Sequence, residues 1–267
     1  MRGLLATLLV AGCAHARPID IDANGLWWEA GVLYAADEAG GRIVAVRGGG
    51  AEPVVALAGV GGQVVRLADG TLVAPGLGGI AAIAPDGSAR AVPGLTSARR
   101  RIGLAPAGPG HVFSAWFEKD VAGGISDVAL AGGERDLVTG LGKPVGLAVS
   151  GGYLWVGDQK GDAVLRCPAS ACAGLERVAK LAAPDLLAPA PDGAVLAASR
   201  GGGVTLVCPD GRTRGIVAGT AATRGVAYDP GGRVFVVERA AKRSTLRVEP
   251  AALGDHPCAQ PLDGGLR

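Results

Sequence analysis

Three acidic residues occupy the same place in a repeated pattern. Asp37, Asp158 and Glu238 each lie six residues after a glycine that precedes a run of strand-forming residues. A ring of carboxylates could bind a cation or exchange protons with a substrate. Acidic side chains at the ends of strands more often accept hydrogen bonds from the backbone of a turn. We therefore expect a structural role for these three residues.

The sequence contains no motif for a serine nucleophile or a zinc protease. Neither Gly-x-Ser-x-Gly nor His-Glu-x-x-His occurs in it. His15, His111 and His256 are too far apart in the sequence to suggest a catalytic base. Serine-hydrolase and metalloprotease chemistry are therefore not expected.

The first thirteen residues combine one basic residue, an apolar run and a cysteine. Arg2 precedes the apolar residues 4–11, and Gly12 and Cys13 follow them. This run is shorter than the about 20 apolar residues that cross a bilayer, and it is typical of a secretory signal. Residues 9–13 resemble the bacterial lipobox, which implies cleavage before Cys13 and lipidation of that residue. The alternative is an ordinary signal peptide with an incidental cysteine.

Lipidation predicts a place in the cell. We expect the chain in the bacterial cell envelope, with Cys13 as its lipid anchor in a membrane. The outer membrane is favoured because Ala14 stands where an aspartate is associated with retention in the inner membrane. The expected partners are this membrane and an unknown small molecule or envelope protein.

Export also decides how the other four cysteines are interpreted. An oxidising compartment favours disulfides over free thiols or zinc thiolates. Of the three possible pairings, we prefer Cys167 with Cys172, which closes a short loop, and Cys208 with Cys258, which joins the C-terminal tail to the body. A zinc site is the alternative, but the spacing is not that of paired Cys-x-x-Cys units.

The charges of the chain nearly balance. There are 26 basic and 24 acidic residues, scattered along the sequence, so no broad basic face for nucleic acid is expected. Arg99, Arg100 and Arg101 form the only dense basic cluster. We expect a solvated loop there, with contact to an anion or a lipid headgroup as the alternative.

A repeat positions all these residues. A glycine followed by strand-forming residues recurs about every forty residues, a period typical of repeat architectures. The six glycines are Gly31, Gly70, Gly110, Gly152, Gly193 and Gly232. An apolar run also precedes each glycine, and two further short runs follow in most repeats.

Four strands per repeat of forty residues predict the blade of a propeller. We therefore expect an all-β fold, a six-bladed β-propeller of four-stranded antiparallel blades. The sixth repeat lacks its fourth strand, and the alternating residues 18–22 are expected to supply it and close the ring. The chain then divides into a signal peptide (1–12), a lipidated tether (13–17), the propeller (18–250) and a C-terminal tail (251–267).

Two stretches carry a resemblance to a known family. Residues 24–37, and residues 143–146 leading to 154–158, resemble the senescence marker protein and gluconolactonase family of six-bladed propellers, whose pattern NHL-repeat propellers share. The resemblance implies one divalent cation, calcium or zinc, at the mouth of the central channel. The three ligand positions fall on Asn24, Val145 and Asp185. Only the aspartate matches, so we expect no metal, with Asn24 and Asp185 as weak candidate ligands.

The equivalent positions of other blades argue for a different site. They fall on Gln63, on Arg101 or Ile102, and on Arg224. We expect an ion pair between Asp185 and Arg224, because a guanidinium pairs well with a carboxylate and would take the place of the cation. With Asn24 and Gln63 nearby, this mouth would form a polar pocket for a neutral or anionic ligand. The alternative is that these side chains only plug the channel.

These observations predict a membrane-anchored propeller that binds a small molecule or a protein partner at its channel mouth without catalysis. The alternative is a metal-dependent lactonase or ester hydrolase of the gluconolactonase type, with calcium or zinc as its cofactor. A purely structural component of the envelope is a third possibility. No catalytic residue is assigned.

Overall fold

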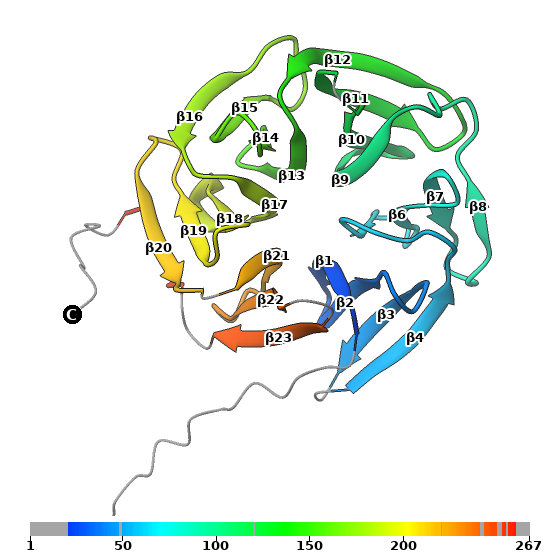
Figure 1. Cartoon of the computed structure of the whole chain (residues 1–267), viewed down its shortest axis with the longest axis horizontal. Coiled ribbons are helices and arrows are strands. Elements are labelled where there is room, and N and C mark those ends of the chain that lie inside the picture. Colours follow the sequence, from blue (N-terminus) through cyan, green and yellow to red (C-terminus); the bar gives the residue numbers. More distant parts are fainter. Residues whose placement is uncertain are drawn as a thin grey trace, which may run out of the picture.

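The computed structural model describes residues 21–47, 50–119, 121–219, 221–240, 243–249, 253–254 and 256–259. In this part of the chain six antiparallel sheets stand in a ring around a central axis (Figure 1). The only helical element described is the 3-10 turn η1 (Pro191–Gly193). The predicted all-β propeller with six blades is confirmed.

Each blade is a meander whose first strand lies nearest the axis. The strands of the first three blades are β1 (Ala23–Glu29), β2 (Val32–Asp37), β3 (Arg42–Arg47) and β4 (Gly50–Ala56); β5 (Val65–Arg66), β6 (Leu72–Gly76), β7 (Gly79–Ile83) and β8 (Ala89–Ala91); β9 (Arg100–Gly108), β10 (His111–Phe117), β11 (Gly123–Ala129) and β12 (Glu134–Leu141). The strands of the last three are β13 (Pro144–Ser150), β14 (Tyr153–Asp158), β15 (Ala163–Pro168) and β16 (Glu176–Lys180); β17 (Pro184–Pro189), β18 (Val195–Ser199), β19 (Val204–Val207) and β20 (Thr213–Val217); β21 (Ala222–Tyr228), β22 (Val234–Ala240) and β23 (Arg243–Glu249).

The six repeat glycines lie in equivalent turns, each just before the second strand of its blade. All six have a positive φ, between 69° and 88°. A side chain would be strained in this conformation, whereas glycine adopts it freely. The period of about forty residues therefore reports the hairpin between the first and second strands.

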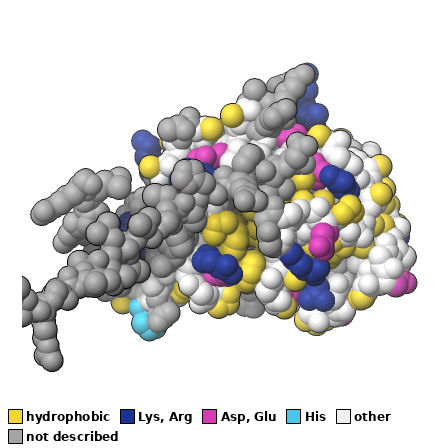
Figure 2. All heavy atoms as spheres, turned by 90° about the horizontal axis from the view of Figure 1, so that it is seen from below, with side chains coloured by type: hydrophobic (Ala, Val, Ile, Leu, Met, Phe, Trp, Pro, Cys, Tyr) yellow, Lys and Arg dark blue, Asp and Glu magenta, His cyan; other side chains and the backbone are white. Residues whose placement is uncertain are grey.

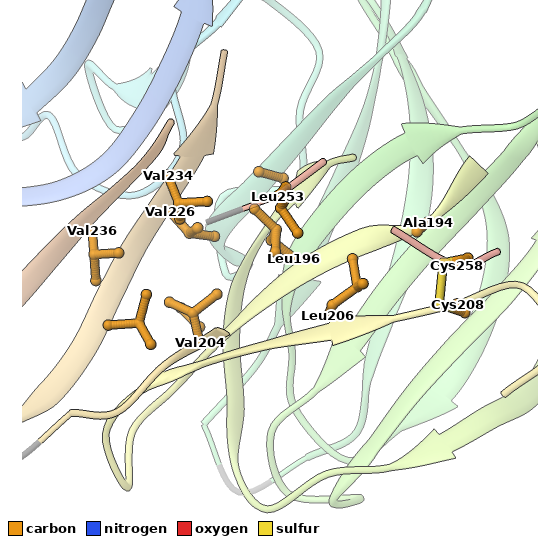
Figure 3. Close-up of a cluster of buried hydrophobic side chains, with 13 residues drawn as sticks. Ala194, Leu196, Val204, Leu206, Cys208, Val226, Val234, Val236, Leu253 and Cys258 are labelled. Carbon is orange, nitrogen blue, oxygen red and sulfur yellow. A yellow bond between two sulfur atoms is a disulfide. The ribbon is translucent and has the colours of Figure 1, made fainter. Parts of the chain in front are cut away.

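The core lies between neighbouring blades and is built from small aliphatic side chains. Figure 3 shows one such cluster, in which Leu196 and Leu206 of the fifth blade pack against Val226 and Val234 of the sixth. Because each blade buries one face against the next, the ring stabilises all of its members together.

Two disulfides join the predicted partners. Cys167 and Cys172 close a short loop after β15, and Cys208 after β19 is bonded to Cys258 in the tail. Leu253 of the tail is buried in the cluster of Figure 3. The tail is therefore attached to the fifth and sixth blades by a covalent bond and by packing.

The last blade has three described strands. Residues 18–20 of the expected closing strand lie outside the described residues, as do the signal peptide, Cys13 and the tether. Ile21 and Asp22 are described, and they belong to no strand. They still contact the last blade, since Ile21 packs near Phe235 and the Ser244 hydroxyl donates to Asp22 Oδ1 (3.3 Å).

Charged side chains are mixed on the surface. On the face seen in Figure 2, basic and acidic side chains of the described residues lie interspersed. No helix in the described ranges has the length and apolarity to span a bilayer. The absence of a nucleic-acid partner stays a prediction.

Candidate functional site

The first strands bring equivalent residues together around the axis. Gly25, Gly103, Gly146 and Gly225 each approach the backbone of a neighbouring blade so closely that a Cβ atom would collide with it. Glycine is needed here because only hydrogen occupies the side-chain position. The residues beside these glycines, namely Asn24, Gln63, Val145, Asp185 and Arg224, therefore surround the axis. We call this place the channel mouth.

The predicted ion pair is present at the channel mouth. Arg224 Nη1 donates to Asp185 Oδ2 at 3.2 Å, between the adjacent strands β21 and β17. The Asp185 side chain is 3% exposed and that of Arg224 is 22% exposed. Burial raises the pKa of Asp185, and it outweighs the opposing attraction of Arg224, Arg200 and Lys143. The carboxylate is therefore held in a place where its charge is costly.

Gln63 lies on the axis, but its side chain is used by the fold. Its Nε2 donates to the carbonyl of Leu187 (3.0 Å), and its Oε1 accepts from the backbone N–H of Leu104 (3.4 Å) and Leu147. It thereby joins the third, fourth and fifth blades while almost completely buried. For this residue the structure supports the alternative that it plugs the channel.

Asn24 faces the first blade's own turn. Its Nδ2 donates to Glu38 Oε1 (2.5 Å), and Glu38 also pairs with Arg239 (3.3 Å). Its Oδ1 is buried and has no hydrogen-bond partner among the described residues. Buried polar atoms are rarely left without partners, so this oxygen is available to a ligand or a water molecule.

The channel mouth does not fit calcium or zinc. Asp185 is already paired with Arg224, Asn24 is turned toward Glu38 through its amide nitrogen, and Val145 is an apolar buried residue. The described part of the chain holds no group of three His, Cys, Asp or Glu residues that could bind a metal. Hard cations need several oxygen ligands, and a guanidinium at the same place repels them.

Three polar residues that the sequence did not reveal complete the mouth. Lys143, just before β13, donates through Nζ to Gln159 Oε1 at 2.8 Å, and Arg200 Nη1 reaches the same oxygen at 3.5 Å. Burial lowers the pKa of Lys143, and the charges of Arg200 and Arg224 add to this effect. We call Lys143, Arg200 and Arg224 the cation cluster.

The repeat itself contains a signal that could have located Gln159 and Arg200 at the channel mouth. The residue seven positions after the repeat glycine lies at or next to the end of the second strand, beside the carboxylates at the sixth position. These residues include Glu38, Phe117, Gln159, Arg200 and Arg239. Hydrogen bonds link several of them, such as Glu38 with Arg239 and Gln159 with Arg200.

The expectation of a solvated arginine loop is wrong. Arg100 and Arg101 belong to β9, and the Arg101 side chain is 1% exposed. Arg101 Nη2 donates to Glu134 Oε2 (2.6 Å), and Arg99 makes two hydrogen bonds with Asp136 (2.7 and 2.8 Å). These four side chains form what we call the blade 3 network. Acidic residues on β12 neutralise the arginines, and a sequence window of three residues could not show them.

The three carboxylates at the sixth position are structural, as expected. Asp158 accepts hydrogen bonds from the backbone N–H groups of Gly142 (3.0 Å) and Lys143 (2.6 Å), and Asp37 likewise accepts from Gly40 (3.1 Å). Glu238 pairs instead with Arg247 on the adjacent strand (2.9 Å). None of the three joins the others in a ring.

Comparisons with known proteins agree on the fold. No family model matches the chain, and a search of curated proteins finds no match. Among solved structures, a gluconolactonase from Xanthomonas campestris is 20% identical, with 87% of each chain covered and a TM-score of 0.72. A structure described as a putative gluconolactonase is 18% identical, covering 88% of this chain and 91% of its own (TM-score 0.71).

A luciferin-regenerating enzyme is 14% identical, covering 86% of this chain and 92% of its own (TM-score 0.66). At these identities the likeness concerns the fold, and function must be argued from the site. The chain is thus a six-bladed propeller with the fold of gluconolactonase-like proteins.

Proposed function

We propose that the chain binds a small polar molecule at its channel mouth without a metal ion and without turning it over. The observation that carries the proposal is the ion pair of Asp185 with Arg224. It stands where the family resemblance places a cation, and Asp185 is the one residue that matches the family's ligand set. An arginine at this place offers hydrogen-bond donors to a ligand instead of a metal ion.

Buried polar atoms at the mouth support a ligand. Asn24 Oδ1 is an acceptor and Arg224 Nε a donor, and neither has a hydrogen-bond partner among the residues described. A polar molecule could satisfy both kinds of atom, and the cost of leaving them unpaired would then be removed on binding. Loops of several blades frame the place, as is usual for sites on rigid scaffolds.

Thermal unfolding of the full chain tests the absence of a metal. After chelation, calcium, zinc, manganese and magnesium are added singly, and a cation that binds the native state must raise the melting temperature. We expect no rise that depends on Asp185. A rise in the wild type that is lost in Asp185→Ala would overturn the proposal.

Hydrolysis of a lactone or an ester is the second candidate. Of the similar solved structures, one is described as a gluconolactonase and another as a putative gluconolactonase, which favours this candidate more than simple binding. The site offers Asp185, whose raised pKa suits a general base, and Arg224, whose guanidinium could stabilise an oxyanion. The residues do not fit a metal, so we derive no metal-dependent step.

A turnover assay separates the two candidates. Hydrolysis of gluconolactone and of an aryl ester is measured for the wild type, for Asp185→Asn, and for Lys180→Gln, which changes an exposed residue on β16. Turnover in the wild type and in Lys180→Gln, but not in Asp185→Asn, would establish the hydrolase. Rates equal to the uncatalysed background in all three support binding alone.

We also propose that Cys13 anchors the chain to a membrane of the bacterial envelope. The N-terminal sequence is the support, and it lies outside the described residues. Labelling of cells with palmitate should mark the wild type and not Cys13→Ser, and the variant should move from the membrane to the soluble fraction. A variant that keeps both label and membrane association would contradict the anchor.

A further inference from the structure

We infer that the ligand of the channel mouth is a small organic anion whose carboxylate is bound by the cation cluster, Lys143, Arg200 and Arg224. This inference rests on the binding function proposed above and names the chemical class of the ligand. Three observations support it: the cluster has more positive than negative charge, it has more hydrogen-bond donors than acceptors, and solvent can reach it.

The cluster has more positive than negative charge. Lys143, Arg200 and Arg224 all act electrostatically on Asp185, which is the one carboxylate paired with any of their side chains in the described residues. The nearby Asp158 is held by backbone N–H groups at 2.6 and 3.0 Å. Even with the charge of Asp158 counted, three cations outnumber two carboxylates, so an anion entering here would meet a net positive field.

The other acidic residues at the mouth do not neutralise the cation cluster. Glu38 and Asp22 both pair with Arg239, at 3.3 and 3.0 Å, on the side formed by the sixth and first blades. Because two carboxylates share one arginine, that side has an excess of negative charge. The positive excess therefore lies on the side of the fourth and fifth blades.

The cluster also has more donors than acceptors. An ammonium carries three N–H donors and a guanidinium five. Against them the described residues provide one oxygen of Asp185 and the neutral oxygen of Gln159, which Lys143 and Arg200 share. The contact of Arg200 is long, at 3.5 Å, and the buried Nε of Arg224 has no partner. A carboxylate would supply the missing acceptors in charge-assisted hydrogen bonds.

The surroundings favour a small carboxylate over a highly charged anion. Asp185 is fixed within the cluster and would repel several negative charges at short range. The ring of Phe117 lies 5.1 Å from Lys143 Nζ and provides an apolar flank for a carbon skeleton. Arg200 is exposed and Lys143 is half-buried, so the cluster can be reached from solvent.

Matched pairs of ligands give the test. Acetate, succinate and benzoate are each compared with the corresponding neutral amide by calorimetric titration of the full chain at low ionic strength. We expect at least one carboxylate to bind about tenfold more tightly than its amide, which corresponds to about 1.4 kcal/mol. Inorganic phosphate is titrated as the tetrahedral alternative and should bind more weakly.

Three variants assign the effect to the cluster. Lys143→Gln and Arg200→Gln each remove a charge but keep a polar side chain, and each should weaken carboxylate binding by about tenfold. Lys180→Gln removes the same charge from the outer strand of the fourth blade and should leave binding within about twofold. All three variants should keep the melting temperature close to that of the wild type.

The outcomes distinguish this inference from the proposed function. If amides bind as well as carboxylates and Arg224→Gln abolishes binding of both, the proposed binding function holds, but the inference that the ligand is an anion is wrong. If phosphate binds as tightly as any carboxylate, the cluster binds anions by charge alone, and the inference that its ligand is a carboxylate is overturned. If no carboxylate binds, or if Lys180→Gln weakens binding as much as the cluster variants, the inference fails.

Discussion

Arginine side chains meet carboxylates in two parts of this molecule, with opposite results. In the blade 3 network, Arg99 and Arg101 face Glu134 and Asp136, so that two cations meet two anions. The hydrogen bond from Arg99 lowers the pKa of Asp136. Burial alone would raise the pKa of Glu134, but hydrogen bonds from Thr96 and Arg101 outweigh it.

In the cation cluster only one carboxylate, Asp185, is paired with any of the three cations among the described residues. Burial dominates there, and the pKa of Asp185 is raised even though Arg224 donates to it. An arginine therefore does not by itself mark a binding site. A balanced set of partners makes the blade 3 network part of the scaffold, whereas the unbalanced cluster keeps donors and charge for a ligand.

Removing a charge from the balanced network should have the largest effect. Glu134→Gln leaves the buried Arg101 without its anionic partner at 2.6 Å, and we expect a loss of about 3 kcal/mol in the free energy of unfolding. Urea denaturation measures it. The matched control is Glu52→Gln, which breaks an exposed pair with Arg47 and should cost less than about 0.5 kcal/mol. Similar small losses for both variants would show that Arg101 does not depend on Glu134 as its anionic partner.

Removing the negative charge of Asp185 from the cation cluster should raise the affinity of the cluster for carboxylates. Asp185→Asn keeps an oxygen that can accept from Arg224 and removes the repulsion of an anion, so carboxylates should bind more tightly by about 1 kcal/mol. Calorimetric titration measures the change. The control Asp210→Asn alters an exposed turn between β19 and β20 with the same change in net charge. Weaker binding in Asp185→Asn alone would mean that Asp185 contacts the ligand directly.

The pH dependence of stability should differ in sign between the two places. Asp136 has a lowered pKa in the folded state. Its contribution to the free energy of unfolding is therefore present above pH 3.8, its ordinary pKa, and is lost as pH falls through the lowered pKa. Asp185 has a raised pKa in the folded state. Its contribution to the free energy of unfolding is therefore greatest below pH 3.8 and is lost as pH rises through the raised pKa.

Urea denaturation across this pH range compares the wild type with Asp136→Asn and with Asp185→Asn. From acidic to neutral pH, the wild type should gain stability relative to Asp136→Asn and lose it relative to Asp185→Asn. Two differences that change in the same direction would show that burial does not dominate at Asp185.

The smallest effect is expected between the two arginines of the network. Arg100 is exposed, whereas its neighbours on either side reach Glu134 and Asp136. Arg100→Gln should change the free energy of unfolding by less than about 0.5 kcal/mol. A larger loss in thermal or urea denaturation would show that the three arginines act as one cluster after all.

The hairpins of the propeller could be predicted because their signals are local. Gly152 and Gly232 recur at one place in the repeat, and both adopt a positive φ of 80° and 87°. The pairing of Cys208 with Cys258 was the preferred one of three possible pairings, and the structure confirms it. The closing strand could not be checked in the same way, because most of residues 18–22 lie outside the described residues.

The side chains of the channel mouth were only partly predictable. Asp185 and Arg224 were found because equivalent positions of neighbouring blades approach the axis, and the structure pairs them at 3.2 Å. Gln63 was placed correctly, but the backbone groups that occupy its amide belong to other blades. Lys143 and Arg200 were missed because each looks like an isolated charge in the sequence.

By itself, the sequence determined the repeat and the turns, since these depend on residues within one blade, and it limited the four cysteines to three possible pairings. Apart from the pair of Asp185 with Arg224, only the tertiary structure decided which charges are neutralised. Arg101 finds Glu134 across its own sheet, and Lys143 meets Arg200 through Gln159 between two blades. The physical reason is that the energy of a charge depends on burial and on partners brought near by packing, and neither is encoded in spacing along the chain.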